Sequence, residues 1–146
     1  MDWKNLDRGV FLVNVNGIVY DPKAKKILIG KRDKDEYIPE LSWSFPGGRP
    51  TYKHSLSMSL RMEIKKKTNL DVNVVDCFFA RTLPERPEFL QIYYFCEVTG
   101  ESKKPKAMEK FKEIKWIKPT EVEKHFTTSI DPVVMEFLGA LEKGEI

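Results

Sequence analysis

The sequence predicts an α/β fold in which a β-sheet is covered by helices on both faces. Strand-like segments precede and follow one central amphipathic helix, and a second helical segment closes the chain. No internal repeat, linker or change of composition divides the 146 residues, so we expect a single domain over residues 1–146. The expected architecture is a three-layer α/β/α sandwich.

The first predicted element is a β-hairpin near the start of the chain. Residues 9–20 (GVFLVNVNGIVY) are rich in β-branched side chains and partly alternate between apolar and polar, and a second apolar run follows at residues 27–29. Residues 21–26 between them contain the Asp, Pro and Lys that are typical of a turn. A charged loop at 33–40 then leads to a short strand, which the Pro46-Gly47-Gly48 segment must end.

The central helix is predicted over residues 54–68. Leu56, Leu60 and Ile64 recur at four-residue spacing with no Gly or Pro between them, which is the pattern of an amphipathic helix. Asn69 suits the C-terminal end of this helix, and the lysines at 65–67 suit the negative pole of its dipole.

Two strands, at residues 72–82 and 89–98, are predicted after this helix and are joined by a loop at 84–87. If that loop closes a hairpin, Cys77 and Cys96 could be cross-strand neighbours, although two reduced thiols are the expected state.

A further strand is predicted at residues 113–117, and the last helix at 132–143. Asp131 is the predicted N-cap of that helix, with Pro132 at its first position.

The composition is that of a globular protein, because 41% of the residues are hydrophobic and 32% are charged. No apolar run approaches the roughly 20 residues of a membrane helix, so we expect a cytoplasmic protein with no membrane partner. The net charge of +3 is unevenly distributed. Residues 49–67 hold six basic side chains against Glu63 alone, a local charge of +5.

The basic segment overlaps a family signature. Residues 43–72 read WSFPGGRPTYKHSLSMSLRMEIKKKTNLDV, which resembles the box of the Nudix hydrolases, G-x5-E-x7-R-E-U-x-E-E-x-G-U, where U is a bulky aliphatic residue. The opening hairpin, the Pro-Gly-Gly segment, the strand at 113–117 and the closing helix follow in the order of that family. The resemblance implies the Nudix fold, a three-layer α/β/α sandwich around a mixed β-sheet.

The box itself departs from the family pattern. Aligning its first glycine with Gly48 places one box glutamate at Glu63, whereas the other box positions hold His54, Met62, Lys66 and Lys67. At these five positions the family pattern has four glutamates and one arginine, a net charge of −3. This chain has one glutamate and two lysines, a net charge of +1.

The lysines change the chemistry that the resemblance implies. In the family, box carboxylates bind magnesium or manganese ions, which neutralise a pyrophosphate linkage and activate a water molecule. An ammonium group cannot ligate a cation, and about 4 Å from a divalent ion it would be repelled by roughly 8 kcal/mol at an effective dielectric of 20. We therefore expect no metal site and no cofactor, and metal-dependent hydrolysis that is lost or weak.

Anion binding could remain without a metal. The resemblance implies ligands of the nucleoside-diphosphate type, such as ADP-ribose, a nucleotide sugar or a nucleoside triphosphate. Glycines allow close backbone approach to a phosphate, basic side chains can bind it, and an aromatic ring can stack on a base. The candidate substrate-binding residues are Arg32, Phe45, Gly47, Gly48, Arg49, Lys66, Lys67 and Arg81. Alternatively, Glu63 and the two lysines form ordinary salt bridges on a solvated helix face.

Other functions stay open. The chain could be an active hydrolase that uses Mg²⁺ or Mn²⁺ with ligands recruited from outside the box, in which case Glu63, Glu85 and Glu88 are the candidate catalytic carboxylates. It could instead be a protein-interaction or regulatory module, and the resemblance allows a homodimer. Two lysine clusters, at 65–67 and 103–106, carry no recognition motif, so they do not favour a nucleic acid as partner.

Overall fold

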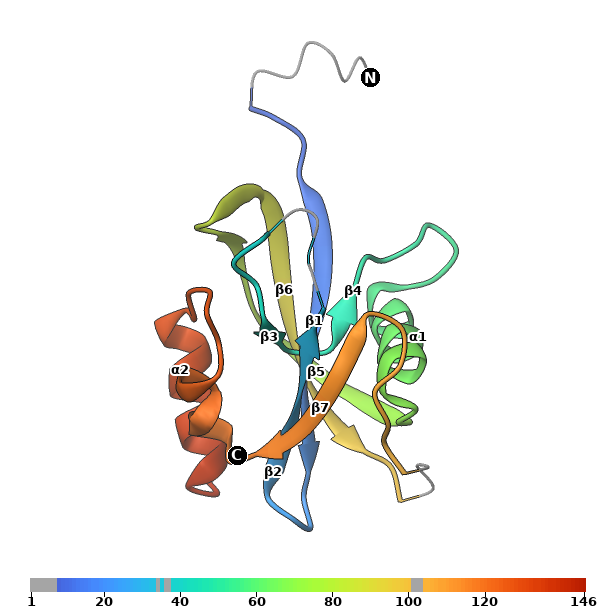
Figure 1. The fold of residues 1–146 in the computed structure, drawn as a ribbon, viewed down its shortest axis with the longest axis vertical. Coiled ribbons are helices and arrows are strands. Elements are labelled where there is room, and N and C mark those ends of the chain that lie inside the picture. Colours follow the sequence, from blue (N-terminus) through green and yellow to red (C-terminus); the bar gives the residue numbers. More distant parts are fainter. Residues whose placement is uncertain (1–7, 34, 36–37, 101–103) are drawn as a thin grey trace.

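The computed structural model describes residues 8–33, 35, 38–100 and 104–146. Parts of the predicted loop at 33–40 and of the lysine cluster at 103–106 lie outside these residues. The described chain forms one mixed sheet with the strand order β3-β2-β1-β6-β5, in which β4 also pairs with β1 and β7 with β2. Helix α1 lies on one side of the sheet and α2 on the other (Figure 1). The predicted three-layer architecture is therefore confirmed.

The predicted opening hairpin is formed by β1 (Leu12–Asp21) and β2 (Lys26–Arg32), which pair antiparallel with Val19 opposite Leu28. Strand β1 also pairs in parallel with β6 (Arg86–Val98), so the sheet is mixed. Strands β3 (Trp43–Ser44) and β7 (Phe111–Ile117) pair with β2, and β4 (Gly47–Gly48) pairs with β1.

The second hairpin, between β5 (Val72–Leu83) and β6, has a tighter turn than the predicted loop, because Arg86 and Pro87 already belong to β6. Its register shifts at three points along β5. Cys77 therefore lies opposite Tyr94, and the expectation that Cys77 and Cys96 are cross-strand neighbours is wrong. Both thiols are free, with Cys96 buried and Cys77 exposed.

Helix α1 (Leu56–Thr68) begins after Ser55, whose hydroxyl accepts a hydrogen bond from the Met58 N–H at 3.2 Å. Asn69 ends the helix in the left-handed conformation, with φ of 66°, as its sequence position predicts. Leu60 and Ile64 are fully buried in the core on this face of the sheet. Each contributes about 1.5–3 kcal/mol through burial.

Helix α2 (Pro132–Glu142) has the predicted cap, because the Asp131 carboxylate accepts a hydrogen bond from the Val133 N–H at 2.8 Å. A short 3-10 helix, η2 (Pro119–Lys124), precedes it. The apolar side of α2 packs on the face of the sheet opposite α1 through Val134, Leu138 and Leu141.

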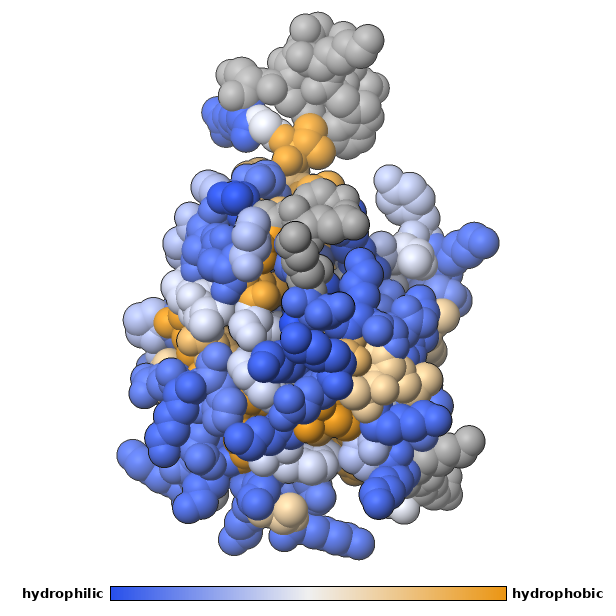
Figure 2. All heavy atoms as spheres, in the orientation of Figure 1, coloured by the Kyte–Doolittle hydropathy of each residue, from blue (hydrophilic) through white to orange (hydrophobic). Residues whose placement is uncertain are grey.

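The surface view in Figure 2 is mostly hydrophilic, and hydrophobic atoms gather at the end where the chain enters β1. The exposed residues there are Val10, Phe11 and Leu12. Among the described helices, none has the length and apolar character needed to cross a membrane.

Candidate nucleotide-binding cavity

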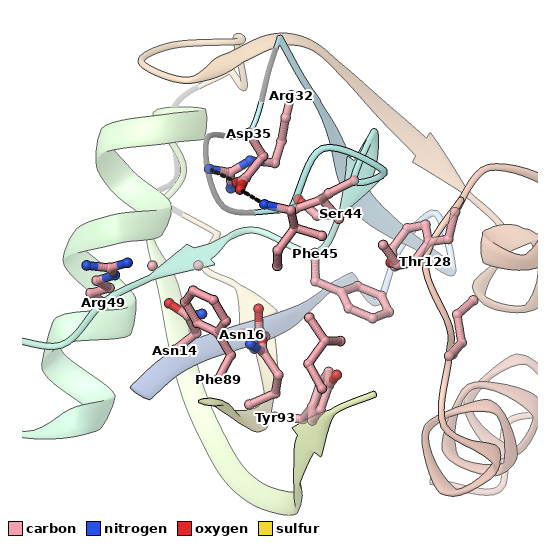
Figure 3. Close-up of a pocket in the computed structure, with 18 of the residues that line it drawn as sticks. Asn14, Asn16, Arg32, Asp35, Ser44, Phe45, Arg49, Phe89, Tyr93 and Thr128 are labelled. Atoms are coloured by element: carbon pink, nitrogen blue, oxygen red, sulfur yellow. Dashed lines mark hydrogen bonds and ion pairs between the residues drawn. The ribbon is translucent and has the colours of Figure 1, made fainter. Parts of the chain in front are cut away.

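A cavity of about 430 Å³ lies above the sheet, between α1 and the loop that leads into α2 (Figure 3). Its floor is made by polar side chains of β1 and β6, and its walls come from α1, the segment around β3 and β4, and residues 126–130. Five basic and two acidic side chains line it, so the lining carries a net charge of +3. Such a cavity suits an anionic ligand.

Most of the predicted site residues come together here. Those that line the cavity are Arg32, Phe45, Gly47, Gly48, Arg49, Glu63, Lys67 and Arg81. Lys66, Glu85 and Glu88 are not part of the lining. His54, at the first box glutamate position, is exposed just before α1.

Lys67 is the buried cation of the cavity. Only 7% of this residue is exposed, and its ammonium group donates a hydrogen bond to the carbonyl oxygen of Gly47. Its nitrogen is also 3.6 Å from an oxygen of Glu63. Burial lowers the pKa of Lys67, and the charge of Glu63 opposes that shift. Lys67 therefore pairs with Glu63, as the salt-bridge interpretation expects, but it does so in a buried position and not on a solvated helix face.

Lys66 behaves differently from its neighbour. Its side chain is 56% exposed and lies 3.9 Å from the other oxygen of Glu63, which is the solvated pair that helical spacing predicts. Glu63 lies close to Gly48, where a Cβ atom would come within 2.8 Å of the Glu63 carboxyl carbon. Glycine at position 48 therefore makes room for the Glu63 side chain.

These residues do not fit a divalent metal ion. Glu63 is the single box carboxylate, and the neighbouring carbonyl of Gly47 is already bonded to the Lys67 ammonium group. Within the described ranges, no group of three or more His, Cys, Asp or Glu side chains could hold a metal ion. Hard cations prefer several oxygen ligands, so we derive no catalytic step through a metal here.

Three buried side-chain atoms have no hydrogen-bond partner among the described residues, and all three belong to residues that line the cavity: Arg32 Nε, Ser44 Oγ and Arg81 Nε. The rest of each guanidinium is anchored, since Arg32 pairs with Asp35 at 3.2 Å and Arg81 donates to the Ser129 carbonyl at 2.8 Å. Buried donors without partners are costly, so acceptors from a ligand or water would stabilise them.

The two candidate loop carboxylates lie elsewhere. Both oxygens of Glu85 accept hydrogen bonds from Ser129, one from its N–H and one from its hydroxyl, each at 2.7 Å. Burial opposes ionisation of Glu85, but these bonds and the nearby Arg81 lower its pKa. Glu88 is exposed on β6. Glu85 thus fixes the loop before α2.

The sequence reasoning missed the amides of the cavity floor, Asn14, Asn16 and Gln91. A signal was present, because the two asparagines alternate with buried apolar residues in β1 and therefore share one face of the strand. Asn16 donates a hydrogen bond to Gln91 at 2.8 Å.

Comparison with known proteins agrees with the fold. The family model that describes the NUDIX domain matches residues 10–137. No curated protein sequence matches the chain significantly.

Three solved structures illustrate the similarity. The MutT protein from Methanosarcina mazei Go1 has a TM-score of 0.69 at 16% identity, over 97% of this chain and 99% of that chain. An ADP-ribose pyrophosphatase from Streptococcus suis 89-1591 has a TM-score of 0.64 at 14% identity, over 92% and 91%. A bifunctional NMN adenylyltransferase/ADP ribose pyrophosphatase from Francisella tularensis, complexed with AMP and a manganese ion, has a TM-score of 0.65 at 15% identity. The match covers 97% of this chain but 44% of that one.

At these identities the structures share a fold with the chain, and the family model supplies the assignment. With a matching model over most of its length, a Pro-Gly-Gly segment before α1 and a mixed sheet between two helices, the chain belongs to the Nudix family.

Proposed function

We propose that this Nudix-family chain binds a nucleotide-type anion in the cavity without a divalent metal ion, and that metal-dependent hydrolysis is lost or weak. The observation that carries the proposal is the position of Lys67, whose ammonium group contacts the Gly47 carbonyl and the Glu63 carboxylate. The Lys67 ammonium group lies between the Gly47 carbonyl oxygen and the Glu63 carboxylate. It offsets the negative charge of Glu63 and would attract the negative charge of a phosphate.

The unpartnered donors support the same proposal. Arg32 Nε, Arg81 Nε and Ser44 Oγ need acceptors, and phosphate oxygens are acceptors with negative charge. Apolar side chains also line the cavity, among them Phe45 and Phe89, so its lining combines charge with the apolar surface that a base requires.

The rival proposal is an active hydrolase that binds Mg²⁺ or Mn²⁺ through carboxylates outside the box. Its candidates are Glu85, which is held by Ser129, and Glu88, which is exposed. Because neither lines the cavity with Glu63, their positions favour binding over this form of catalysis. A protein-interaction module is a further alternative, and such a module would not require a cationic cavity.

The test is ligand binding with and without metal. We expect ADP and ADP-ribose to raise the melting temperature in EDTA, and added Mg²⁺ to leave their affinity unchanged. Lys67→Met should abolish the shift, whereas Lys53→Met, at an exposed position outside the cavity lining, should preserve it. No shift with any compound of this type would contradict the proposal.

Catalysis is tested separately. A panel of ADP-ribose, nucleotide sugars and nucleoside triphosphates is assayed with Mg²⁺ or Mn²⁺ for the natural chain and for a variant carrying His54→Glu, Met62→Arg, Lys66→Glu and Lys67→Glu. We expect turnover to be gained in the variant. If the natural chain turns over as fast as the variant, the inference that the box lysines remove catalysis is wrong.

A further inference from the structure

Asn16 and Gln91 form a hydrogen-bonded amide pair in the middle of the cavity floor, and we infer that this pair binds the polar edge of a nucleobase. The inference rests on the proposed function, because it concerns the part of the ligand that the phosphate-binding residues do not reach. It assigns base selectivity to two residues outside the Nudix box.

The pair leaves one acceptor and one donor available to a ligand. The side-chain nitrogen of Asn16 donates to the side-chain oxygen of Gln91 at 2.8 Å. Across the part of the chain that the structure describes, no hydrogen bond engages the other oxygen, Asn16 Oδ1, or the nitrogen Gln91 Nε2. Gln91 is only 7% exposed and lines the cavity, where its free N–H groups are available to a ligand. If both amides were turned over together, the pair would still present one donor and one acceptor.

Strand register places the pair between two cationic ends of the cavity. Asn16 lies opposite Gly47, whose carbonyl holds Lys67, and Gln91 lies opposite Arg81 on β5. Adjacent strands are about 4.8 Å apart, so the row from β4 through β1 and β6 to β5 spans about 14 Å. In Figure 3, Asn16 lies in the middle of the cavity, between Arg49 near α1 and Thr128 on the opposite wall.

The chemistry of the pair selects a base over a phosphate. A phosphate oxygen accepts hydrogen bonds and cannot satisfy the carbonyl oxygen of Asn16, which needs a donor. A nucleobase edge carries a donor beside an acceptor, as adenine does with its amino group and the adjacent ring nitrogen. Ribose hydroxyls could also supply a donor. The neighbouring walls contain Phe45, Phe89 and Phe126, which suit a planar ring better than a polyhydroxylated sugar.

The experiment compares AMP with ribose 5-phosphate by calorimetry in EDTA, since ribose 5-phosphate carries a hydroxyl group where AMP carries the base. We expect the natural chain to bind AMP at least about tenfold more tightly. Gln91→Leu and Asn16→Ala should reduce AMP affinity to that of ribose 5-phosphate and leave the affinity for ribose 5-phosphate unchanged. The matched control is Asn73→Ala, at an exposed asparagine of β5 outside the cavity lining, which should change neither affinity.

A second measurement needs no variant and so does not depend on how the substitutions fold. Purine riboside 5′-monophosphate lacks the amino group of AMP, and we expect the natural chain to bind it about tenfold more weakly than AMP. Equal binding of AMP and ribose 5-phosphate would overturn the base assignment while leaving phosphate binding intact. Equal weakening of both ligands by Gln91→Leu would place the pair against the ribose and also overturn it. Binding of neither ligand would overturn the base assignment, and it would overturn the proposed function only if ADP and ADP-ribose also fail to bind.

Discussion

The carboxylate of Glu85 holds Ser129 with both of its oxygens, 44 residues away along the chain. One bond is made to the backbone N–H and the other to the hydroxyl, while Arg81 donates to the carbonyl of the same residue. The turn between β5 and β6 thereby fixes the loop that forms one wall of the cavity. Glu85 and Arg81 together therefore anchor that wall at Ser129.

Replacing Glu85 with Ala should release the loop. The N–H of Ser129 loses its acceptor, so its hydrogen exchange should become faster by about tenfold, the effect of losing one charged hydrogen bond. Exchange measured by NMR checks this, with Glu88→Ala on exposed β6 as the matched control. Unchanged protection of Ser129 would contradict the proposed anchoring role.

The same contact should weaken in acid. Because the pKa of Glu85 is lowered below its ordinary value of 4.5, the folded state favours the ionised carboxylate. Its stabilising effect is complete above the unfolded pKa and is lost as pH falls through the lower folded value. We expect the Ser129 amide resonance to shift in this acidic window in the natural chain and to lose that transition in Glu85→Gln.

Lys67→Glu should create a divalent cation site. The substitution frees the Gly47 carbonyl and places a second carboxylate one helical turn from Glu63, so three oxygen donors can converge. Manganese binding followed by electron paramagnetic resonance should appear in this variant and be undetectable in the natural chain. Lys66→Glu makes the same charge change on the exposed side, and it should bind manganese more weakly. Equal binding by both variants would show that charge, and not the Gly47 carbonyl, controls the site.

The two thiols should differ sharply in reactivity. Cys77 is exposed, whereas burial raises the pKa of Cys96 to about 12, which leaves almost no thiolate at pH 8. A thiol reagent should therefore modify a single cysteine of the folded chain, and the second only in denaturant. Cys77→Ser should remove the fast reaction entirely. Fast modification of both residues in the folded chain would contradict the packing of β6.

Two glycines should respond to alanine in opposite directions. Gly139 lies in α2 with nothing within 4 Å of a Cβ atom, so Gly139→Ala should stabilise the chain by about 1 kcal/mol. A Cβ atom on Gly47 would lie 2.0 Å from the Val15 carbonyl oxygen, which forces β4 away from β1. Gly47→Ala should cost about 1–3 kcal/mol or more. Urea denaturation measures both.

Local signals in the sequence predicted much of the fold. Asn69 ends α1 as expected through its left-handed backbone, whose N–H bonds to the Lys65 carbonyl, and Asp131 begins α2 by accepting a hydrogen bond from the Val133 N–H. Both interactions span only a few residues. The pairing of Cys77 could not be predicted in the same way. Its register depends on bulges in β5, and these follow from packing across the sheet.

In the candidate site, too, the features that depend on local sequence could be predicted, and those that depend on distant residues could not. The reversed charge of the box could be read directly from Lys66 and Lys67, and most of the predicted residues do line one cavity. Whether either lysine turns inward could not be predicted, because that depends on the carbonyl of Gly47, 20 residues away. The amide pair was missed for the same reason, since its members lie on strands that pair in the sheet but are 75 residues apart in the sequence.

The parallel pairing of β1 with β6 has a consequence for synthesis on the ribosome. Asn16 and Gln91 are 75 residues apart in the chain, and the register of these two strands brings them together. Contacts of such long separation form slowly, because loop closure costs entropy before pairing stabilises it. While β6 is still inside the ribosome the cavity floor cannot form, and the edge of β1 that pairs with β6 stays without hydrogen-bond partners. Chaperone binding to stalled chains should therefore be strongest for lengths that end before Arg86.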